Sequence, residues 1–329
     1  MRILVTGGCG FIGSHLVDEL NSFGHIVDVV DDLSSGDIDN IDSEKKIVLP
    51  HFLSQLSVKE SRIGKVLIIT SDFCDKYIIN SILENKYDVV YHLAANPSVS
   101  YSFDFPMESH EVNLTKAFKI FHSCAKSGTK LIFSSSSSVY GNAEKIPTKE
   151  THDLNPLSPY GIQKMTCENY IKFLSKNYDL NYVILRYSNV YGPKASGGRY
   201  KTVIPSWLNS IKNKEIISFE GSGDQLRDFI FIDDVTKANS KCINKNIKNQ
   251  IYNISSCKTI CNKEILCSIL NINPKIEDEI KINYLPERKS DITITQLLNK
   301  KAINAKLISN QMVDFETGLK KTMKWFGLI

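Results

Sequence analysis

The feature that most constrains the fold is a glycine-rich turn directly after the first apolar stretch. The run Thr6-Gly-Gly-Cys-Gly-Phe-Ile-Gly13 follows a short β-type segment at 3–5 and leads into a helical pattern at 11–23, which Gly24 closes. Glycines spaced three apart permit a tight turn, let backbone amides approach a pyrophosphate and allow close packing of helix on strand. This strand-turn-helix context predicts a dinucleotide-binding site.

Strand and helix patterns alternate over the first half of the chain. Helical patterns separate most of its apolar runs, which we expect to be buried parallel strands. The alternation predicts an α/β fold, a Rossmann-like doubly wound parallel sheet. The pattern loosens after about residue 186, so we expect an NAD-binding domain at 1–185, a smaller C-terminal substrate-binding lobe at 186–329, and some chain exchange between them. The apolar runs lie at 3–5, 26–30, 66–69, 89–91, 131–133 and 182–185.

Two further segments carry weaker expectations. A second helical pattern spans 158–176. The polar stretch 39–65 has only partial helical periodicity, and we expect it to be a surface insertion.

The choice of dinucleotide follows from two carboxylates. Asp31 ends the second predicted strand about 20 residues after the glycines, where a carboxylate can bind the ribose hydroxyls of the cofactor. Asp32 adds a second negative charge, and no arginine follows nearby. Because two carboxylates would repel a 2′-phosphate, NAD is favoured over NADP.

Composition excludes several other classes of protein. A length of 329 residues with 42% hydrophobic content supplies a sizeable core, and a net charge of +4 with interspersed signs gives no reason to expect nucleic acid or membrane binding. The eight cysteines contain no Cys-x-x-Cys pair, so no metal site is expected. Without a leader pattern or an apolar run of transmembrane length, we expect a reduced cytoplasmic protein.

A tyrosine and a lysine offer candidate chemistry. Tyr160 and Lys164 are four apart, which places both on one face of a helix, where the ammonium can lower the pKa of the phenol towards that of a general base. A chain with 14 tyrosines should contain about one such spacing by chance, so the pair alone is weak. Its meaning depends on the serine run that precedes it, which includes Ser136, and on the other motifs.

Those motifs extend in order over nearly the whole chain, beginning with the glycine turn. The others are Asp31-Asp-Leu-Ser-Ser-Gly36, His92-Leu-Ala-Ala95, Ser134-Ser-Ser136, Tyr160-x-x-x-Lys164, Arg186-Tyr-Ser-Asn-Val-Tyr-Gly-Pro193, Gly221-Ser-Gly-Asp-Gln-Leu-Arg-Asp-Phe229, Tyr252-Asn-Ile254 and Pro286-Glu-Arg288-x-x-Asp291. Together they resemble the extended short-chain dehydrogenase/reductase family of NAD-dependent nucleotide-sugar epimerases and dehydratases, and among its members the UDP-hexose 4-epimerases.

The resemblance implies a catalytic set and a cofactor set. Tyr160 would be the base, Ser136 would share a hydrogen bond with the sugar 4-hydroxyl, and Lys164 would hold the nicotinamide ribose. Asp72 and Phe73 would flank the adenine. The implied cofactor-binding residues are Gly7, Gly10, Phe11, Ile12, Gly13, Asp31, Asp32, Ser35, Gly36, Asp72, Phe73, Leu93, Ala94, Ala95, Asn113, Tyr160, Lys164 and Tyr187.

It also implies a pocket for a nucleoside diphosphate sugar. Arg227 and Arg288 would clamp the diphosphate, a use suited to a planar and permanently charged guanidinium. Glu220 stands where relatives often carry an aromatic or amide side chain, which leaves the base less certain, with uridine favoured. The implied substrate-binding residues are Ser98, Ser136, Asn189, Val203, Trp207, Glu220, Arg227, Arg288, Asp291 and Thr295.

The reaction follows from what is missing beside the catalytic serine. Dehydratases of the family carry Asp-Glu there to eliminate water, whereas this chain has Ser137-Ser138. The expected activity is therefore NAD-dependent C4 epimerisation through a 4-keto sugar. Thr295 replaces a bulky tyrosine that narrows the pocket in glucose/galactose epimerases, so UDP-GlcNAc/UDP-GalNAc is favoured, with UDP-Glc/UDP-Gal as further candidate substrates.

Several alternatives stay open at this point. UDP-glucuronate 4-epimerisation, or another NDP-sugar dehydratase or reductase activity, would use the same fold. A net dehydrogenase would accumulate reduced cofactor, and a non-catalytic dinucleotide-binding regulator should lack Tyr160, Lys164 or the arginines. Family members usually dimerise through helices of the dinucleotide domain, which implies a homodimer.

Overall fold

The centre of the molecule is one sheet of eight parallel strands. The computed structural model describes residues 1–42, 44, 46–50, 64–195, 202–286 and 292–329. The strand order is β11-β7-β6-β5-β1-β2-β4-β3, and every neighbouring pair is parallel. The strands are β1 (Arg2–Thr6), β2 (Ile26–Asp31), β3 (Lys46–Pro50), β4 (Val66–Thr70), β5 (Val89–His92), β6 (Lys130–Ser136), β7 (Tyr182–Tyr187) and β11 (Gln250–Ile254). The predicted doubly wound α/β fold is confirmed.

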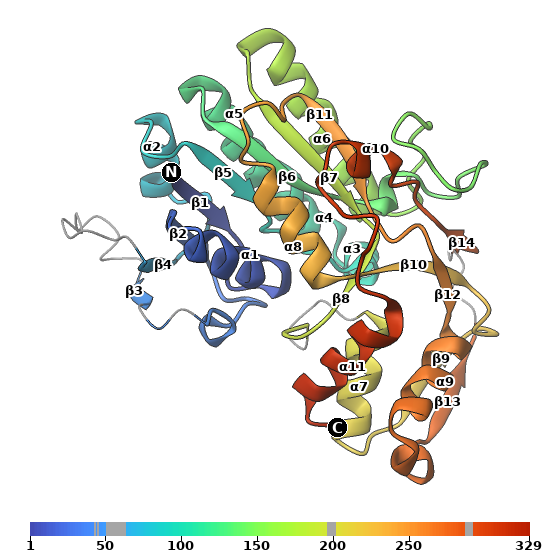
Figure 1. Ribbon diagram of the computed structural model, residues 1–329. Helices are drawn as coiled ribbons and strands as arrows, with labels where there is room; N and C mark the ends of the chain where they lie inside the picture. Colours follow the sequence, from blue (N-terminus) through green and yellow to red (C-terminus); the bar gives the residue numbers. More distant parts are fainter. Residues whose placement is uncertain (43, 45, 51–63, 196–201, 287–291) are drawn as a thin grey trace.

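Helices cover both faces of this sheet (Figure 1). On one face, α1 (Phe11–Ser22) packs beside α8 (Ile232–Lys241). On the other lie α2 (Lys76–Leu83), α5 (Ala117–Ser127) and α6 (Pro159–Tyr178). Between β5 and α5 the chain forms α3 (Val99–Asp104), α4 (Pro106–His110) and the π-helical turn η3 (Glu111–Lys116). Short 3-10 turns are η1 (Ile38–Asn40) and η4 (Ser137–Val139).

A smaller lobe follows the seventh strand. A four-stranded sheet contains β8 (Asn189–Tyr191), β10 (Leu226–Phe231), β12 (Thr259–Cys261) and β14 (Ile294–Thr295), and a two-stranded sheet pairs β9 (Ile217–Glu220) with β13 (Ile282–Leu285). Its helices include α7 (Val203–Lys212), α9 (Asn262–Ile272) and the C-terminal α11 (Phe315–Phe326), which lies beside α7 in Figure 1. The remaining short elements are η5 (Pro274–Glu279) and α10 (Lys300–Asn304).

The helix ends agree with the local sequence. Gly24, just beyond α1, has a φ of 78°, which suits glycine at the end of a helix. The Ser158 hydroxyl accepts a hydrogen bond from the N–H of Gly161 and caps α6, whose first residue is proline. Both helix predictions are confirmed to within two residues.

The expectation for 39–65 was wrong for residues 46–50. They form β3, a strand at the edge of the sheet that pairs in parallel with β4. Five residues carry too little periodicity to identify a strand, because its hydrogen-bonding partner lies further along the chain. Residues 51–63 of the stretch lie outside the described residues.

The C-terminal half also contributes to the main sheet. Strand β11 pairs with β7 from Gln250 to Ile254, so the sequence after residue 186 returns to the dinucleotide-type sheet. The proposed boundary at 185/186 lies within β7. The division into 1–185 and 186–329 remains a proposal, with chain exchange as expected.

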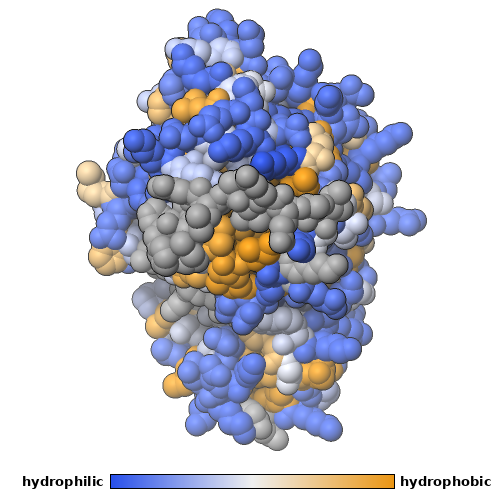
Figure 2. All heavy atoms as spheres, turned by 90° about the vertical axis from the view of Figure 1, so that its left-hand side faces the viewer, coloured by the Kyte–Doolittle hydropathy of each residue, from blue (hydrophilic) through white to orange (hydrophobic). Residues whose placement is uncertain are grey.

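The outer surface is predominantly polar on the face seen in Figure 2, with hydrophobic side chains gathered mainly near the middle and lower part of the view. Among the residues that the structure describes, no helix is long and apolar enough to cross a membrane.

Candidate active site

A cavity of about 370 Å³ lies at the carboxyl edge of the main sheet. Strands β1, β2, β5, β6 and β7 all end at this edge. Residues at the ends of these strands, or just after them, line the cavity. Residues after position 186 line it too, from Tyr187 to Val190 and at Lys194, Ala195 and Thr202. This is the crevice in which open α/β sheets bind their ligands.

Close backbone packing explains the glycine turn after β1. A Cβ on Gly13 would lie 2.1 Å from the carbonyl oxygen of Gly7, and one on Gly7 would lie 2.7 Å from the backbone nitrogen of Ala94. Gly7 also has a φ of 71°. Any side chain at either position would push α1 or the segment after β5 away from the turn. The turn therefore holds the N-terminus of α1 against the cavity, where its free amides favour an anion.

The Asp31 carboxylate is fixed at the end of β2. Its Oδ2 accepts the N–H of Cys9 at 2.9 Å, and its Oδ1 accepts the N–H of Leu33 at 2.9 Å. Burial raises the pKa of Asp31, and these two donors oppose the rise. The carboxylate thus links the glycine turn to the segment after β2.

The Tyr160, Lys164 and Ser136 side chains line one part of the cavity. Lys164 Nζ donates to the carbonyl oxygen of Ser134 at 2.7 Å and lies 5.8 Å from the centre of the Tyr160 ring. Burial lowers the pKa of Lys164 to about 8. Ser136 Oγ lies 2.8 Å from Ser138 Oγ and accepts the N–H of Ser138. The arrangement gathers a phenol, an ammonium and two hydroxyls.

A buried ion pair supports this group from behind. Arg186 of β7 binds Glu168 of α6 through two nitrogens, at 2.9 and 2.6 Å, and both side chains are at most 2% exposed. Ser135 Oγ donates to the same carboxylate at 2.6 Å. Ser135 precedes Ser136, and Glu168 is one helical turn after Lys164, so the pair fixes β6, α6 and β7 relative to one another.

Seventeen of the predicted site residues line this cavity. Among the predicted residues of the larger lobe that lie outside this lining, Asn113 is buried and bonds Asn96 and Gln163, and Asp72 pairs with Lys116. The lining residues are Gly7, Gly10, Phe11, Ile12, Gly13, Asp31, Asp32, Ser35, Phe73, Leu93, Ala94, Ala95, Ser136, Tyr160, Lys164, Tyr187 and Asn189.

The predicted residues away from the lining have varied surroundings. Trp207 is 3% exposed, stacks on Phe219 and donates to the Ser218 carbonyl at 3.0 Å. Arg227 and Thr295 are register partners in β10 and β14. Gly36 adjoins Cys9 and Asp31, and Ser98 caps α3. Val203 begins α7, and Glu220 ends β9. Arg288 and Asp291 lie outside the described residues.

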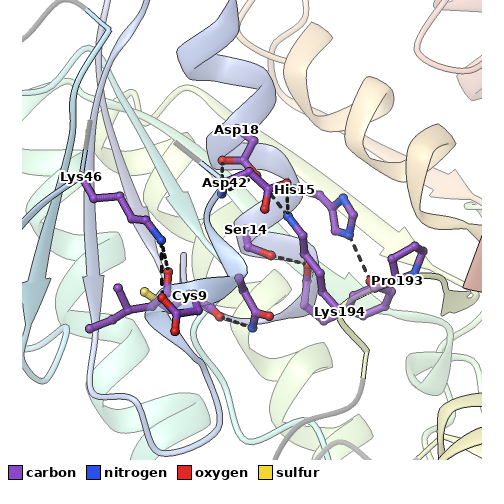
Figure 3. Close-up of polar contacts among 12 residues, drawn as sticks. Cys9, Ser14, His15, Asp18, Asp42, Lys46, Pro193 and Lys194 are labelled. Atoms are coloured by element: carbon purple, nitrogen blue, oxygen red, sulfur yellow. Dashed lines mark hydrogen bonds and ion pairs between the residues drawn. The ribbon is translucent and has the colours of Figure 1, made fainter. Parts of the chain in front are cut away.

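Sequence reasoning missed Lys194, which also lines the cavity. Figure 3 shows its side chain reaching towards Asp18 and Asp42, with distances of 3.2 and 2.8 Å from Nζ to the two carboxylates. A single lysine after Gly-Pro carries no local signal of such a role. Lys194 meets Asp18 and Asp42 only because the folded chain brings the segment after β8 against α1.

Comparison with known proteins places the chain in a family. The family model described as "NAD dependent epimerase/dehydratase family" matches residues 3–255. The chain belongs to this NAD-dependent epimerase/dehydratase family. Its members act on nucleotide sugars with NAD as cofactor, and this chain is accordingly an NAD-dependent nucleotide-sugar epimerase or dehydratase.

Three similar proteins illustrate the range of the family. The UDP-glucose 4-epimerase of Thermotoga maritima, solved with UDP-glucose, is 32% identical, with a TM-score of 0.85 and 99% of both chains covered. The UDP-N-acetylglucosamine 4-epimerase of Methanobrevibacter ruminantium is 33% identical, with a TM-score of 0.83, covering 99% of this chain and 97% of that one. The dTDP-D-glucose 4,6-dehydratase of Mus musculus is 29% identical over 99% of this chain and 88% of its own length.

The residues present fit NAD. The tight turn without side chains at Gly7 and Gly13, the amides at the start of α1 and the fixed Asp31 carboxylate match the needs of a pyrophosphate and an unphosphorylated ribose. When bound, NAD supplies a reversible hydride acceptor at its nicotinamide. The protein supplies the proton carrier and the polar groups that orient a hydroxyl.

Proposed function

We propose that this protein is an NAD-dependent UDP-sugar 4-epimerase. Its favoured substrates are UDP-GlcNAc and UDP-GalNAc, with UDP-Glc and UDP-Gal as further candidates. Family membership alone leaves the reaction open, because dehydratases share the fold and cover nearly the whole chain. The decision between the two reactions rests on the groups beside the catalytic serine.

The observation that supports epimerisation is the distribution of carboxylates around the cavity. Among the described lining residues, the carboxylates are Asp31, Asp32 and Asp37, all at or after the end of β2. Ser136 ends β6, which is separated from β2 by β5 and β1. Three strand spacings amount to roughly 14 Å. An elimination across C5 and C6 needs an acid and a base close to the sugar, and none of these carboxylates is suitably placed.

The groups near Ser136 are sufficient for reversible oxidation at C4. Tyr160 takes the proton of the 4-hydroxyl as the C4 hydride departs, and Ser136 Oγ holds the same oxygen through a hydrogen bond. Lys164, positioned by the Ser134 carbonyl, stabilises the phenolate form of Tyr160. After the 4-keto sugar rotates, hydride returns to the opposite face of C4, and Tyr160 gives the proton back. The cycle consumes no external oxidant.

The test is incubation of the purified protein with UDP-Glc, UDP-GlcNAc and UDP-GlcA, followed by NMR analysis of the products. C4 inversion of the N-acetylhexosamine is expected to be fastest. Dehydrated products or accumulated NADH would overturn the proposal, and inversion of UDP-GlcA alone would support the uronate alternative.

Replacement of Tyr160 by Phe tests the role of the phenol. We expect the rate of inversion to fall by about 10²- to 10⁴-fold, the usual contribution of a general acid-base group, while NAD stays bound. Tyr178→Phe, at the exposed end of the same helix, is the matched control and should leave the rate unchanged. Full activity in Tyr160→Phe would refute the assigned role.

We also propose that two copies associate through α5 and α6. The outer face of α6 carries exposed apolar side chains at helical spacing, namely Ile162, Tyr170 and Phe173, with exposed fractions of 50, 42 and 55%. Phe118 of α5 packs on Tyr170 with ring centres 4.7 Å apart and extends this surface. A second copy would remove these side chains from water.

A further inference from the structure

Lys194 joins two segments that form different walls of the cavity. It follows β8 and Pro193 and lies five residues after Asn189, on the side of the smaller lobe. Its Nζ lies 3.2 Å from Asp18 Oδ2 on α1 and 2.8 Å from Asp42 Oδ2 after η1. The Lys194 side chain is only 10% exposed. A lysine so fully enclosed between two carboxylates is held in one position.

Helix α1 contacts the same segment at a second point. His15 and Asp18 are three residues apart, hence on one face of α1. His15 Nε2 lies 3.1 Å from the carbonyl oxygen of Pro193, as Figure 3 shows. Burial lowers the pKa of His15, so the ring is neutral at pH 7 and its Nε2–H donates to Pro193. The two contacts together fix the Pro193-Lys194 segment on the helix that begins at the glycine turn.

Asp42 extends the connection to the ribose side of the cofactor site. Its N–H donates to the Asp18 carboxylate, at 3.1 Å from Oδ1 and 3.2 Å from Oδ2. Two residues earlier, Asn40 Nδ2 donates to the Cys9 carbonyl at 3.0 Å. Cys9 N–H in turn donates to Asp31. Polar contacts at Lys194–Asp42, Asn40–Cys9 and Cys9–Asp31, joined by the backbone between residues 40 and 42, therefore connect Lys194 to the glycine turn and Asp31.

The charges explain why the connection depends on the lysine. Without the ammonium, the partly buried carboxylate of Asp18 and the exposed carboxylate of Asp42 would face each other with no positive charge between them, and they would repel each other. Because both acidic partners engage its ammonium, Lys194 is held for this contact rather than for a ligand phosphate. Loss of its charge should separate the 37–42 segment from α1 and loosen both walls.

We propose that Lys194 is a positioning residue that couples the NAD cradle to the nucleotide-sugar side of the cavity, so that each ligand holds the other in place. The inference rests on the proposed function, since it assumes that a nucleoside diphosphate occupies the smaller-lobe side beside Asn189. In an enzyme that must return hydride to the same sugar, such coupling keeps the cofactor bound for the whole cycle. UDP should then slow the release of NAD.

The test measures NAD release from the purified NAD-loaded protein, with and without saturating UDP, by the NAD that remains bound after timed dilution and gel filtration. In the wild type UDP is expected to slow release. In Lys194→Ala the ratio of the two rates should fall by about tenfold, within the usual range of coupling between sites. In Lys194→Arg, which keeps the charge, the ratio should lie between the values of the wild type and Lys194→Ala.

Two further variants keep the result interpretable. Asp42→Asn removes one partner at an exposed position, so it should fold and should also lower the ratio. Lys320→Ala removes a lysine that pairs with Glu316 at 3.2 Å on α11, and it should leave the ratio at the wild-type value.

Two outcomes would overturn the inference. One is an unchanged ratio in Lys194→Ala and Asp42→Asn, whether or not release itself becomes faster, and the other is no effect of UDP on NAD release from the wild type. Calorimetric titration with UDP separates the last outcome from failure of the proposed function. If UDP binds but does not change the rate of NAD release, only the proposed coupling is refuted. If UDP does not bind, the nucleotide-sugar assignment itself is contradicted.

Discussion

At the scale of single residues, the unusual group is Lys164, an ammonium that is only 3% exposed. Burial lowers the pKa of Lys164 from 10.5 to about 8. Below about pH 8 the amine is charged in both the folded and the unfolded chain, and its desolvation lowers the free energy of unfolding. Between about pH 8 and 10.5 the unfolded chain holds more protons than the folded one, so this penalty shrinks as pH rises.

Lys164→Met should therefore stabilise the NAD-free protein most at pH 7. We expect a gain of about 3 kcal/mol at pH 7, at 1.36 kcal/mol per pKa unit, and little gain near pH 10.5. Urea unfolding at pH 7, 9 and 10.5 measures this difference, with Lys176→Met, on the exposed face of the same helix, as control. A gain that is independent of pH would contradict the assigned ionisation.

Thr295 carries the prediction about substrate size. Its partner in register is Arg227, so its position is tied to a predicted diphosphate ligand. Thr295→Tyr is expected to lower kcat/KM for UDP-GlcNAc relative to UDP-Glc by roughly 10- to 200-fold, the usual range of discrimination between substrates that differ in size. Thr295→Ser, which leaves the space open, is the control. Equal losses on both substrates would show that Thr295 does not determine size selectivity.

At the scale of secondary-structure elements, Asp228 holds β10 to the chain on either side of it. Its Oδ1 accepts the N–H and hydroxyl of Ser256, and its Oδ2 accepts the N–H groups of Cys257 and Leu297. Burial raises the pKa of Asp228 to about 6. Arg227 precedes it on the same strand, and Asn189 donates to its backbone carbonyl. The carboxylate therefore holds in place the strand that carries Arg227 and contacts Asn189, two predicted substrate ligands.

Asp228→Asn should weaken both stability and substrate binding at pH 7. An amide offers one acceptor oxygen where the carboxylate has two, so at least one buried N–H loses its partner at a cost of about 1–3 kcal/mol. Urea unfolding measures that loss, and KM for the UDP-sugar is expected to rise. Asp224→Asn, on the exposed turn before β10, is the control. Unchanged unfolding in Asp228→Asn would argue against its structural role.

Element prediction succeeded where the evidence was local. The glycine turn and α1, and the Ser158 cap with α6, depend on contacts between residues close in sequence, so their patterns were sufficient. Strands β3 and β11 lie at the two edges of the sheet, and each is added by pairing with a single neighbour. Such pairing is decided by distant residues, which a periodicity cannot identify.

At the scale of the whole molecule, the proposed homodimer can be tested on α6. Phe173→Glu places a charge in the exposed apolar face and should convert a dimer into monomers in sedimentation velocity. Lys320→Glu, at an exposed position on α11 and outside α5 and α6, is the control and should leave the dimer intact. A wild-type protein that sediments as a monomer at micromolar concentration would exclude this interface.

The sequence by itself determined the sheet type, the glycine turn and the groups that end the central strands. These features follow from local periodicity, glycine stereochemistry and the convergence of parallel strand ends at one edge. Only the tertiary structure decided that Arg186 and Glu168 form a buried pair behind Ser136, that β11 returns to the main sheet, and that Lys194 lies between Asp18 and Asp42. Those contacts join residues 18 to 176 positions apart, and their energies depend on burial and geometry that exist only once the chain has folded.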